Sequence, residues 1–232
     1  MKVLMVLTSH GELGNTGEKT GFWIEEFAAP YYVLEDAGVE ITLASPKGGQ
    51  PPIDPKSEDE NSQTHFTRRF ATDVMLKEKL SSTHKLSEMI ADYYDGVFYP
   101  GGHGPLWDLT TDENSIGLIQ AFNDKQKPIA FVCHAPAALL NTQIQNGDPL
   151  VKDKEVTGFS NNEEASIKLT DTVPFLLEDS LIKLGARYTK STSWEVNVKK
   201  DGNLITGQNP ASSEEAAKVF LQALKNEKNM VA

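Results

Sequence analysis

Pro128-Ile129-Ala130-Phe131-Val132-Cys133-His134-Ala135 is the stretch of this 232-residue chain that best indicates its fold. Residues 128–132 form a short apolar run of the length of a buried strand, and a predicted helix, 135–141, follows at once. Cys133 and His134 therefore occupy a sharp turn between strand and helix. A turn of this kind holds a side chain in the open at the carboxyl end of a strand.

Strand and helix patterns alternate along the rest of the chain. Short apolar or alternating runs predict further strands at 2–7, 39–44, 96–99, 155–157, 195–199 and 203–206. Helical patterns cover 20–38, 85–91, 112–126, 173–184 and a last stretch from Ser213. This order predicts an α/β fold with a mostly parallel sheet covered on both faces, and any site should lie at the carboxyl ends of the strands.

The chain shows no internal repeat and no linker, so we expect a single domain over residues 1–232. One stretch interrupts the pattern, an irregular excursion at about 46–66 whose first part is rich in proline, glycine, lysine and aspartate. Loops of that length often shape an active site.

Charge and composition limit the partners. The formal net charge is −11, which argues against nucleic acid and anionic membranes, because both attract basic proteins. The first apolar run stops at Thr8, too early for a secretory or membrane segment. Cys133 is the single cysteine, so it cannot form an intramolecular disulfide and suits a reducing compartment. We expect a cytoplasmic protein that binds small molecules or a second copy of itself.

Cys133 carries the strongest chemical signal. The amides of the helix after it are expected to favour its thiolate, and the imidazole of His134 is placed to take its proton. The alternative is that Cys133 is simply a small buried apolar residue, and that His134 only packs beside it. The strand-end position and the adjacent histidine favour a nucleophile.

Glu26 is a second candidate. It lies in line with Phe22, Ala29 and Val33 on a helical face that is otherwise apolar. A carboxyl group buried there is expected to have a raised pKa and to donate or accept protons. The alternative is one charge at the boundary of an amphipathic helix.

Two further segments could complete a site. The turn Gly101-Gly102-His103-Gly104 follows the strand at 96–99, and the amides of Gly102 or His103 could stabilise an oxyanion. The acids Glu163 and Glu164 follow the strand at 155–157, and either could orient His134. The residues alone do not decide between the two acids. Both segments also fit plainer interpretations, an ordinary turn and a charged helix start.

Several motifs together resemble the ThiJ/PfpI superfamily. They are Pro100-Gly101-Gly102-His103-Gly104, Phe131-Val132-Cys133-His134-Ala135-Pro136, Val156-Thr157-Gly158-Phe159 and Thr206-Gly207-Gln208-Asn209-Pro210-Ala211-Ser212. Gly21-Phe22-Trp23-Ile24-Glu25-Glu26 and the long excursion resemble the branch of heat-shock chaperones and glutathione-independent glyoxalases. The resemblance implies a flavodoxin-like three-layer sandwich, similar to class I glutamine amidotransferases, and a homodimer.

The resemblance also implies roles for residues. Cys133 would be the nucleophile, His134 its partner, Glu164 the triad acid and Glu26 the acid/base that contacts the thiol. The activity would be the conversion of methylglyoxal to lactate through a hemithioacetal, with no metal, nucleotide or redox cofactor. The chain contains no cysteine cluster and no His-x-x-x-His pair that would favour a metal.

Other functions share these features. A holding chaperone active in stress would work through exposed apolar surface, and a protein deglycase would use closely related chemistry. A redox sensor would need reversible oxidation of Cys133. A cysteine peptidase would use the same thiol, but nothing in the sequence defines a peptide cleft. An amidotransferase is disfavoured because no histidine follows His134, where that class has its catalytic histidine.

Overall fold

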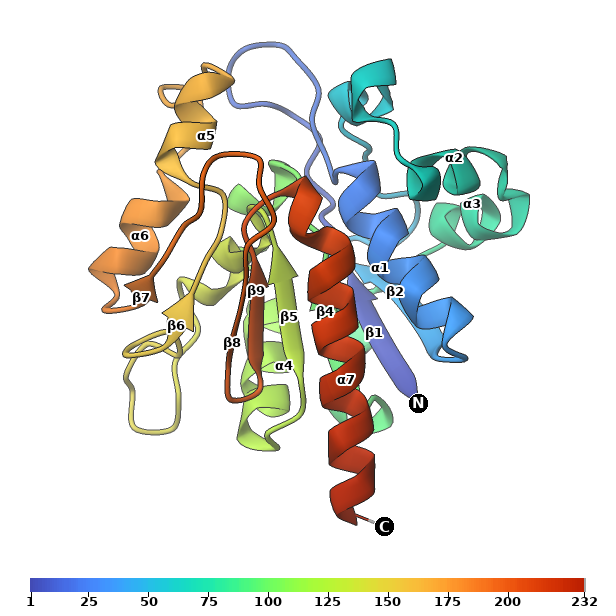
Figure 1. The fold of residues 1–232 in the computed structure, drawn as a ribbon, viewed down its shortest axis with the longest axis vertical. Helices are drawn as coiled ribbons and strands as arrows, with labels where there is room; N and C mark the ends of the chain where they lie inside the picture. Colours follow the sequence, from blue (N-terminus) through green and yellow to red (C-terminus); the bar gives the residue numbers. More distant parts are fainter. Residues whose placement is uncertain (232) are drawn as a thin grey trace.

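A seven-stranded sheet forms the centre of the computed structural model, which describes residues 1–231 and their side chains as far as residue 227 (Figure 1). The strand order is β3-β2-β1-β4-β5-β9-β8, and every neighbouring pair is parallel except β8 and β9. The strands are β1 (Lys2–Val6), β2 (Glu40–Ser45), β3 (His84–Lys85), β4 (Gly96–Tyr99), β5 (Ile129–Val132), β8 (Val198–Asp201) and β9 (Leu204–Gly207). The prediction of a mostly parallel α/β sheet is confirmed.

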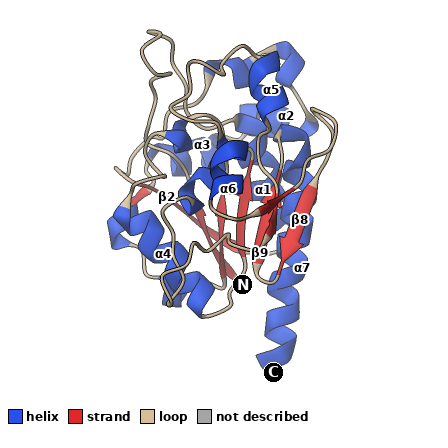
Figure 2. Ribbon diagram, turned by 90° about the vertical axis from the view of Figure 1, so that its left-hand side faces the viewer, coloured by secondary structure: helices blue, strands red, loops and turns tan. Residues whose placement is uncertain are grey.

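Helices cover both faces of this sheet (Figures 1 and 2). On one face, α1 (Ile24–Asp36) packs beside α7 (Ser213–Val231), and α4 (Glu113–Asp124) lies on the other. Alternate residues of β1 explain the layering, because Val3 and Met5 point into the first core while Leu4 and Val6 point into the second. The strands are buried on both sides, as is usual in parallel sheets.

A second, smaller part lies beside the sheet. We call residues 153–197 the outlying segment; they appear yellow to orange in Figure 1. Its strands β6 (Glu155–Val156) and β7 (Arg187–Tyr188) pair with each other in a separate two-stranded sheet. Its helices are α5 (Asn161–Ser166) and α6 (Leu177–Lys183). The segment brings α5 to the end of the main sheet where the parallel strands finish.

Several predicted elements differ from the structure. The helix expected at 85–91 is instead the end of β3 followed by two 3₁₀ turns, Leu86–Glu88 and Ala91–Tyr93. The helix expected at 135–141 is a 3₁₀ helix, Ala135–Leu139, and the one expected from Val173 begins only at Leu177, after Pro174. Proline removes an amide donor, so both segments depart from a regular α-helix near one.

The region after the excursion also holds more structure than its sequence pattern indicates. Two 3₁₀ turns, Pro55–Glu58 and Glu60–Ser62, lie within the excursion, and the unpredicted helices α2 (His65–Thr72) and α3 (Val74–Ser81) follow it. Thr64 forms a capping box that starts α2, and Asp73 caps α3. Across the described part of the chain, no helix combines the length and the apolar character needed to cross a bilayer.

Candidate active site

Cys133 stands at the carboxyl end of β5 in a strained backbone conformation. Its φ is +62°, a left-handed value that residues with a Cβ seldom adopt, and its amide donates to the carbonyl of Gly207 at 2.9 Å. Cys133 is buried, with 3% of the residue exposed. Strain at such a strand-to-turn junction is typical of nucleophiles held in a fixed direction.

His134 connects the thiol to a carboxylate. Its Nδ1 lies 3.3 Å from the Sγ of Cys133, and its Nε2 lies 2.6 Å from Oε2 of Glu164. Burial and the neighbouring His103 lower the pKa of His134, so the imidazole is neutral near neutral pH. An ionised carboxylate only accepts hydrogen bonds, so Nε2 carries the proton and the lone pair of Nδ1 faces the thiol.

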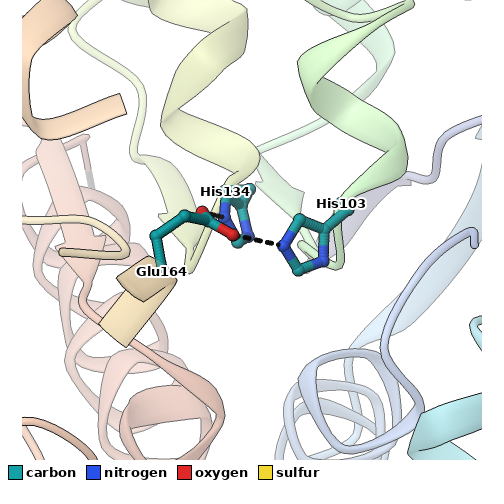
Figure 3. Close-up of side chains that lie close together, drawn as sticks. All are labelled: His103, His134 and Glu164. Carbon is teal, nitrogen blue, oxygen red and sulfur yellow. Dashed lines mark hydrogen bonds and ion pairs between the residues drawn. The ribbon is translucent and has the colours of Figure 1, made fainter. Parts of the chain in front are cut away.

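Glu164 is shared by two histidines. Its Oε2 binds His134, and its Oε1 accepts from Nε2 of His103 at 2.9 Å (Figure 3). Burial alone would raise the pKa of Glu164, but the interactions with His134 and His103 outweigh burial and hold it well below its usual value. Glu164 is therefore ionised and fixes the orientation of both rings.

Glu163, the neighbouring acid, points away from His134 into another network. Its side chain is fully buried and accepts from the backbone and hydroxyl of Ser160, the backbone N–H of Trp194, and the side-chain amides of Gln208 and Asn209. Of the two acids that the residues alone left open, the structure places Glu164, and not Glu163, against His134.

Glu26 is fully buried beside the thiol of Cys133 and the amides of Gly101 and Gly102, but neither of its oxygens makes a hydrogen bond of good geometry among the described residues. Burial raises its pKa to about 8, and the nearby thiol of Cys133 and amides of Gly102 and Gly101 offset only part of that shift. Glu26 therefore keeps its proton at neutral pH and can donate it. The stripe argument correctly placed this carboxyl group in an apolar environment.

The expectation of a thiol activated by helix amides is wrong for the resting site. Burial and the adjacent Glu26 raise the pKa of Cys133 well above its ordinary value. The helix after Cys133 is only a five-residue 3₁₀ helix, so it contributes little dipole. A nucleophilic thiol at this position would have to lose its proton as it attacks, and Nδ1 of His134, 3.3 Å away, is placed to accept it.

The glycine turn fits between α1 and β5 because it has no side chains there. A Cβ on Gly101 would come within 2.4 Å of Oε2 of Glu26, and one on Gly102, at φ +91°, within 2.3 Å of the carbonyl of Gly21. The amide of Gly102 approaches the sulfur of Cys133. The turn thus closes the backbone around the thiol, and His103 after it reaches Glu164 rather than solvent.

A cavity of about 100 Å³ opens onto the thiol. Cys133, His134, Glu26, Gly102 and His103 line it, whereas Gly101 is not among the lining residues. Most of the remaining wall is apolar, formed by Leu13, Trp23, Phe159, Ile167, Leu169, Trp194 and Pro210, and the excursion adds Asp54 and Lys56. Sequence reasoning missed Trp194, since its local sequence carries no motif.

His103, His134 and Glu164 could in principle bind a metal ion, because one donor atom from each lies within 4.8 Å of the others. In this structure both oxygens of Glu164 already accept from an imidazole. The three side chains therefore form a closed hydrogen-bonded unit that orients His134 toward the thiol.

The fold and the site define a class, α/β proteins with a cysteine, a histidine and a glutamate gathered at the carboxyl end of a parallel sheet. The chain belongs to the DJ-1/PfpI family, whose model matches residues 19–223. Among curated proteins, it is 30% identical to Glyoxalase 3 of Candida albicans over 97% of this chain and 99% of that protein. It is 29% identical to glutathione-independent glyoxalase HSP31 of Saccharomyces cerevisiae, over 97% and 98%.

Solved structures agree with this assignment. Rapid Encystment Protein 24 kDa of Francisella tularensis superimposes with a TM-score of 0.92 at 41% identity, covering 96% of this chain and 98% of that one. Glyoxalase III of Candida albicans superimposes with a TM-score of 0.88 at 29% identity, covering 96% and 97%. The resemblance noted in the motifs is confirmed over nearly the whole chain.

Proposed function

We propose that this protein is a glutathione-independent glyoxalase that converts methylglyoxal to lactate. One observation carries the proposal: the thiol of Cys133 lies between a neutral imidazole that can accept its proton and a buried, protonated carboxyl group, Glu26. Isomerising an α-oxoaldehyde needs a nucleophile for the aldehyde and groups that move protons between adjacent carbons. The names of the relatives support the same activity.

The first step is capture of the aldehyde. The sulfur of Cys133 bonds to the aldehyde carbon while the thiol proton passes to Nδ1 of His134. The carbonyl oxygen takes the proton of Glu26, which gives a neutral hemithioacetal. Glu164 stabilises the imidazolium that results, as the acid of a triad does.

The second step is the isomerisation. The carboxylate of Glu26 removes the proton from the former aldehyde carbon, the electron pair of that C–H bond forms a carbon–carbon double bond, and the ketone oxygen takes the proton of His134. Glu26 then returns its proton to the second carbon, and the hydroxyl proton on the first carbon passes to His134. The product is a thioester of lactate on Cys133.

Water completes the cycle. It attacks the thioester and gives a proton to Glu26, the carbon–sulfur bond breaks, and the departing sulfur takes the proton of His134. Lactic acid leaves and ionises in solution. Because Cys133 does what a soluble thiol would do, no glutathione enters any step.

The test is turnover by the purified protein without any added thiol. Proton NMR should show methylglyoxal consumed and lactate formed in equal amounts, and Cys133→Ala should reduce the rate at least about a thousandfold. Cys133→Ala must retain the melting temperature of the wild type for this comparison. Lactate formation at an unchanged rate in that variant would refute the proposal.

A holding chaperone remains the second candidate, favoured by exposed apolar side chains such as Met75 and Val74 on α3. That function would survive Cys133→Ala, because it does not use the thiol. Equal suppression of client aggregation by the wild type and Cys133→Ala, together with absent turnover, would favour it.

We also propose that the protein is a homodimer, which light scattering would test.

A further inference from the structure

The apolar wall of the cavity has a feature that the chemistry above does not use. Trp194 lies in the cavity wall, yet its side chain is 46% exposed, so one surface of the indole faces the cavity region and another faces solvent. Its position at the mouth of an apolar cavity leaves the indole accessible to a ligand in that cavity. The segment that carries it rises from β7 to the end of the sheet where α5 lies (Figure 1).

The position of Trp194 is firmly held. Its backbone adopts φ +70°, an unfavourable value for a bulky residue, and its N–H donates to Oε1 of Glu163 at 2.9 Å. Gln208 and Asn209 donate to the same oxygen, at 3.1 and 2.8 Å. Burying a carboxyl group costs desolvation free energy, which these hydrogen bonds offset. They also fix the loop that carries the indole.

Aromatic rings connect Trp194 to the reacting atoms. Its ring meets Phe159 edge-on at 5.6 Å between centroids, and Phe159 packs on His134 at 4.3 Å. Phe159 is buried and Trp194 is exposed, so the indole is the accessible ring at the outer end of this row. A substrate bonded to Cys133 would extend from His134 along Phe159 toward Trp194.

The charged groups at the rim are already engaged. Asp54 accepts from the hydroxyl of Thr20 at 2.8 Å and from the backbone of Lys56 at 3.0 Å, and Nζ of Lys56 lies 3.3 Å from Glu18. Lys56 is the one cationic side chain in the described wall of the cavity, and it is paired with Glu18. The wall instead suits a hydrocarbon group.

We propose that Trp194 determines specificity, and that the preferred substrates are α-oxoaldehydes with an aromatic or large apolar substituent. The inference rests on the proposed glyoxalase function and names its substrate class. The dicarbonyl head occupies the small cavity at Cys133, while the substituent packs against the indole. Glu163 acts as a positioning residue for this wall.

The test compares phenylglyoxal with glyoxal, which has no substituent and serves as the internal reference. We expect kcat/KM of the wild type to be at least tenfold higher for phenylglyoxal. Trp194→Ala should lower kcat/KM for phenylglyoxal about tenfold, mainly through KM, and change the glyoxal value less than twofold. Trp194→Phe should restore most of the loss, and Tyr93→Ala, which removes an exposed aromatic residue outside the cavity wall, should change neither substrate.

A binding measurement separates this inference from the activity itself. Calorimetry with 2-hydroxyacetophenone and hydroxyacetone, which lack an aldehyde, should show tighter binding of the former and about tenfold weakening by Trp194→Ala only for it. If no aldehyde is turned over but the two ketones bind in this pattern, the glyoxalase proposal fails, while the role of Trp194 in binding aromatic groups is supported. Equal effects of Trp194→Ala on both substrates, or equal binding of both ketones, would overturn the role of Trp194.

Discussion

The seven-stranded sheet and the outlying segment, residues 153–197, contribute to one site by different physical means. The sheet carries Cys133, whose amide is fixed by a backbone hydrogen bond to the adjacent strand β9. The outlying segment carries Glu164 and Trp194, whose positions depend on hydrogen bonds made by side chains. The difference suggests a division of labour, in which the sheet places the reacting atom and the segment orients and selects what meets it.

Glu163 and Glu164 show this division within two adjacent residues. Both are buried at the start of α5, yet one binds two imidazoles and the other binds only backbone, hydroxyl and amide donors. We therefore expect Glu164 to affect the reaction and Glu163 to affect the stability of the fold. Substituting each by its amide breaks the two functions separately.

Of the variants in the outlying segment and its histidine partners, Glu164→Gln should have the largest effect on turnover. The amide cannot accept from both imidazoles, so His134 loses its fixed tautomer and kcat should fall by about 10²–10⁴. The melting temperature, followed by circular dichroism, should change little, so the loss of kcat cannot be explained by unfolding. A decrease below threefold in kcat would show that Glu164 does not serve as the triad acid.

Glu163→Gln should have the opposite profile. Its amide group leaves some donors unpaired, so the free energy of unfolding should fall by about 2–3 kcal/mol, as measured in urea, while kcat for glyoxal changes less than tenfold. If Glu163→Gln lowers kcat as strongly as Glu164→Gln and leaves stability unchanged, the two acids do not differ in role as described.

Glu26→Gln tests how the buried carboxyl group on α1 makes the free energy of unfolding depend on pH. Because the folded pKa of Glu26 is raised to about 8, its stabilising contribution is complete below the unfolded pKa and is lost as pH rises toward 8. The uncharged variant should therefore gain stability relative to the wild type between pH 5 and pH 9, by roughly 3–5 kcal/mol. Urea unfolding at the two pH values measures this, and a pH-independent difference would contradict a raised pKa.

The same group should shape the pH dependence of turnover. In the proposed mechanism the protonated form of Glu26 donates to the oxyanion, so kcat/KM of the wild type should fall above about pH 8, approaching tenfold per pH unit. Toward acidic pH the rate should hold until His134 gains a proton, below its ordinary pKa. A rate that rises steadily from pH 7 to 10 would instead indicate a thiolate formed by simple ionisation.

His103→Ala should have a smaller effect on kcat than Glu164→Gln. It removes one of the two donors to Glu164 but leaves the bond between Glu164 and His134, so kcat should fall about tenfold. His103→Gln, whose amide can reach the same oxygen, should recover most of the rate. An effect as large as that of Glu164→Gln would assign His103 a direct part in the reaction.

The part of the site on the sheet could be predicted from the sequence because its signals are local. Cys133 follows an apolar run directly, the glycine turn follows another, and Glu26 stands out by helical periodicity. These elements are fixed by backbone hydrogen bonding, which strand and helix patterns encode. Their burial and their mutual approach in the structure follow from the parallel topology.

The outlying segment was less predictable for the same reason. Nothing local separates Glu163 from Glu164, and only their distant partners do so, His134 for one and Asn209 for the other. Trp194 lies in an irregular loop at positive φ, where periodicity gives no signal. The helices α2 and α3 were not predicted because each has only eight residues, too few for a clear helical period.

The proposed mechanism depends on a covalent bond between Cys133 and the aldehyde. This bond can be tested by acid quenching of Glu26→Gln shortly after mixing with methylglyoxal, followed by intact mass and peptide mapping. We predict an added mass of one methylglyoxal on the peptide containing Cys133, absent when Cys133→Ser is introduced into the same variant. Lactate formation by the wild type with no adduct on Cys133 in any quenched sample would contradict the account.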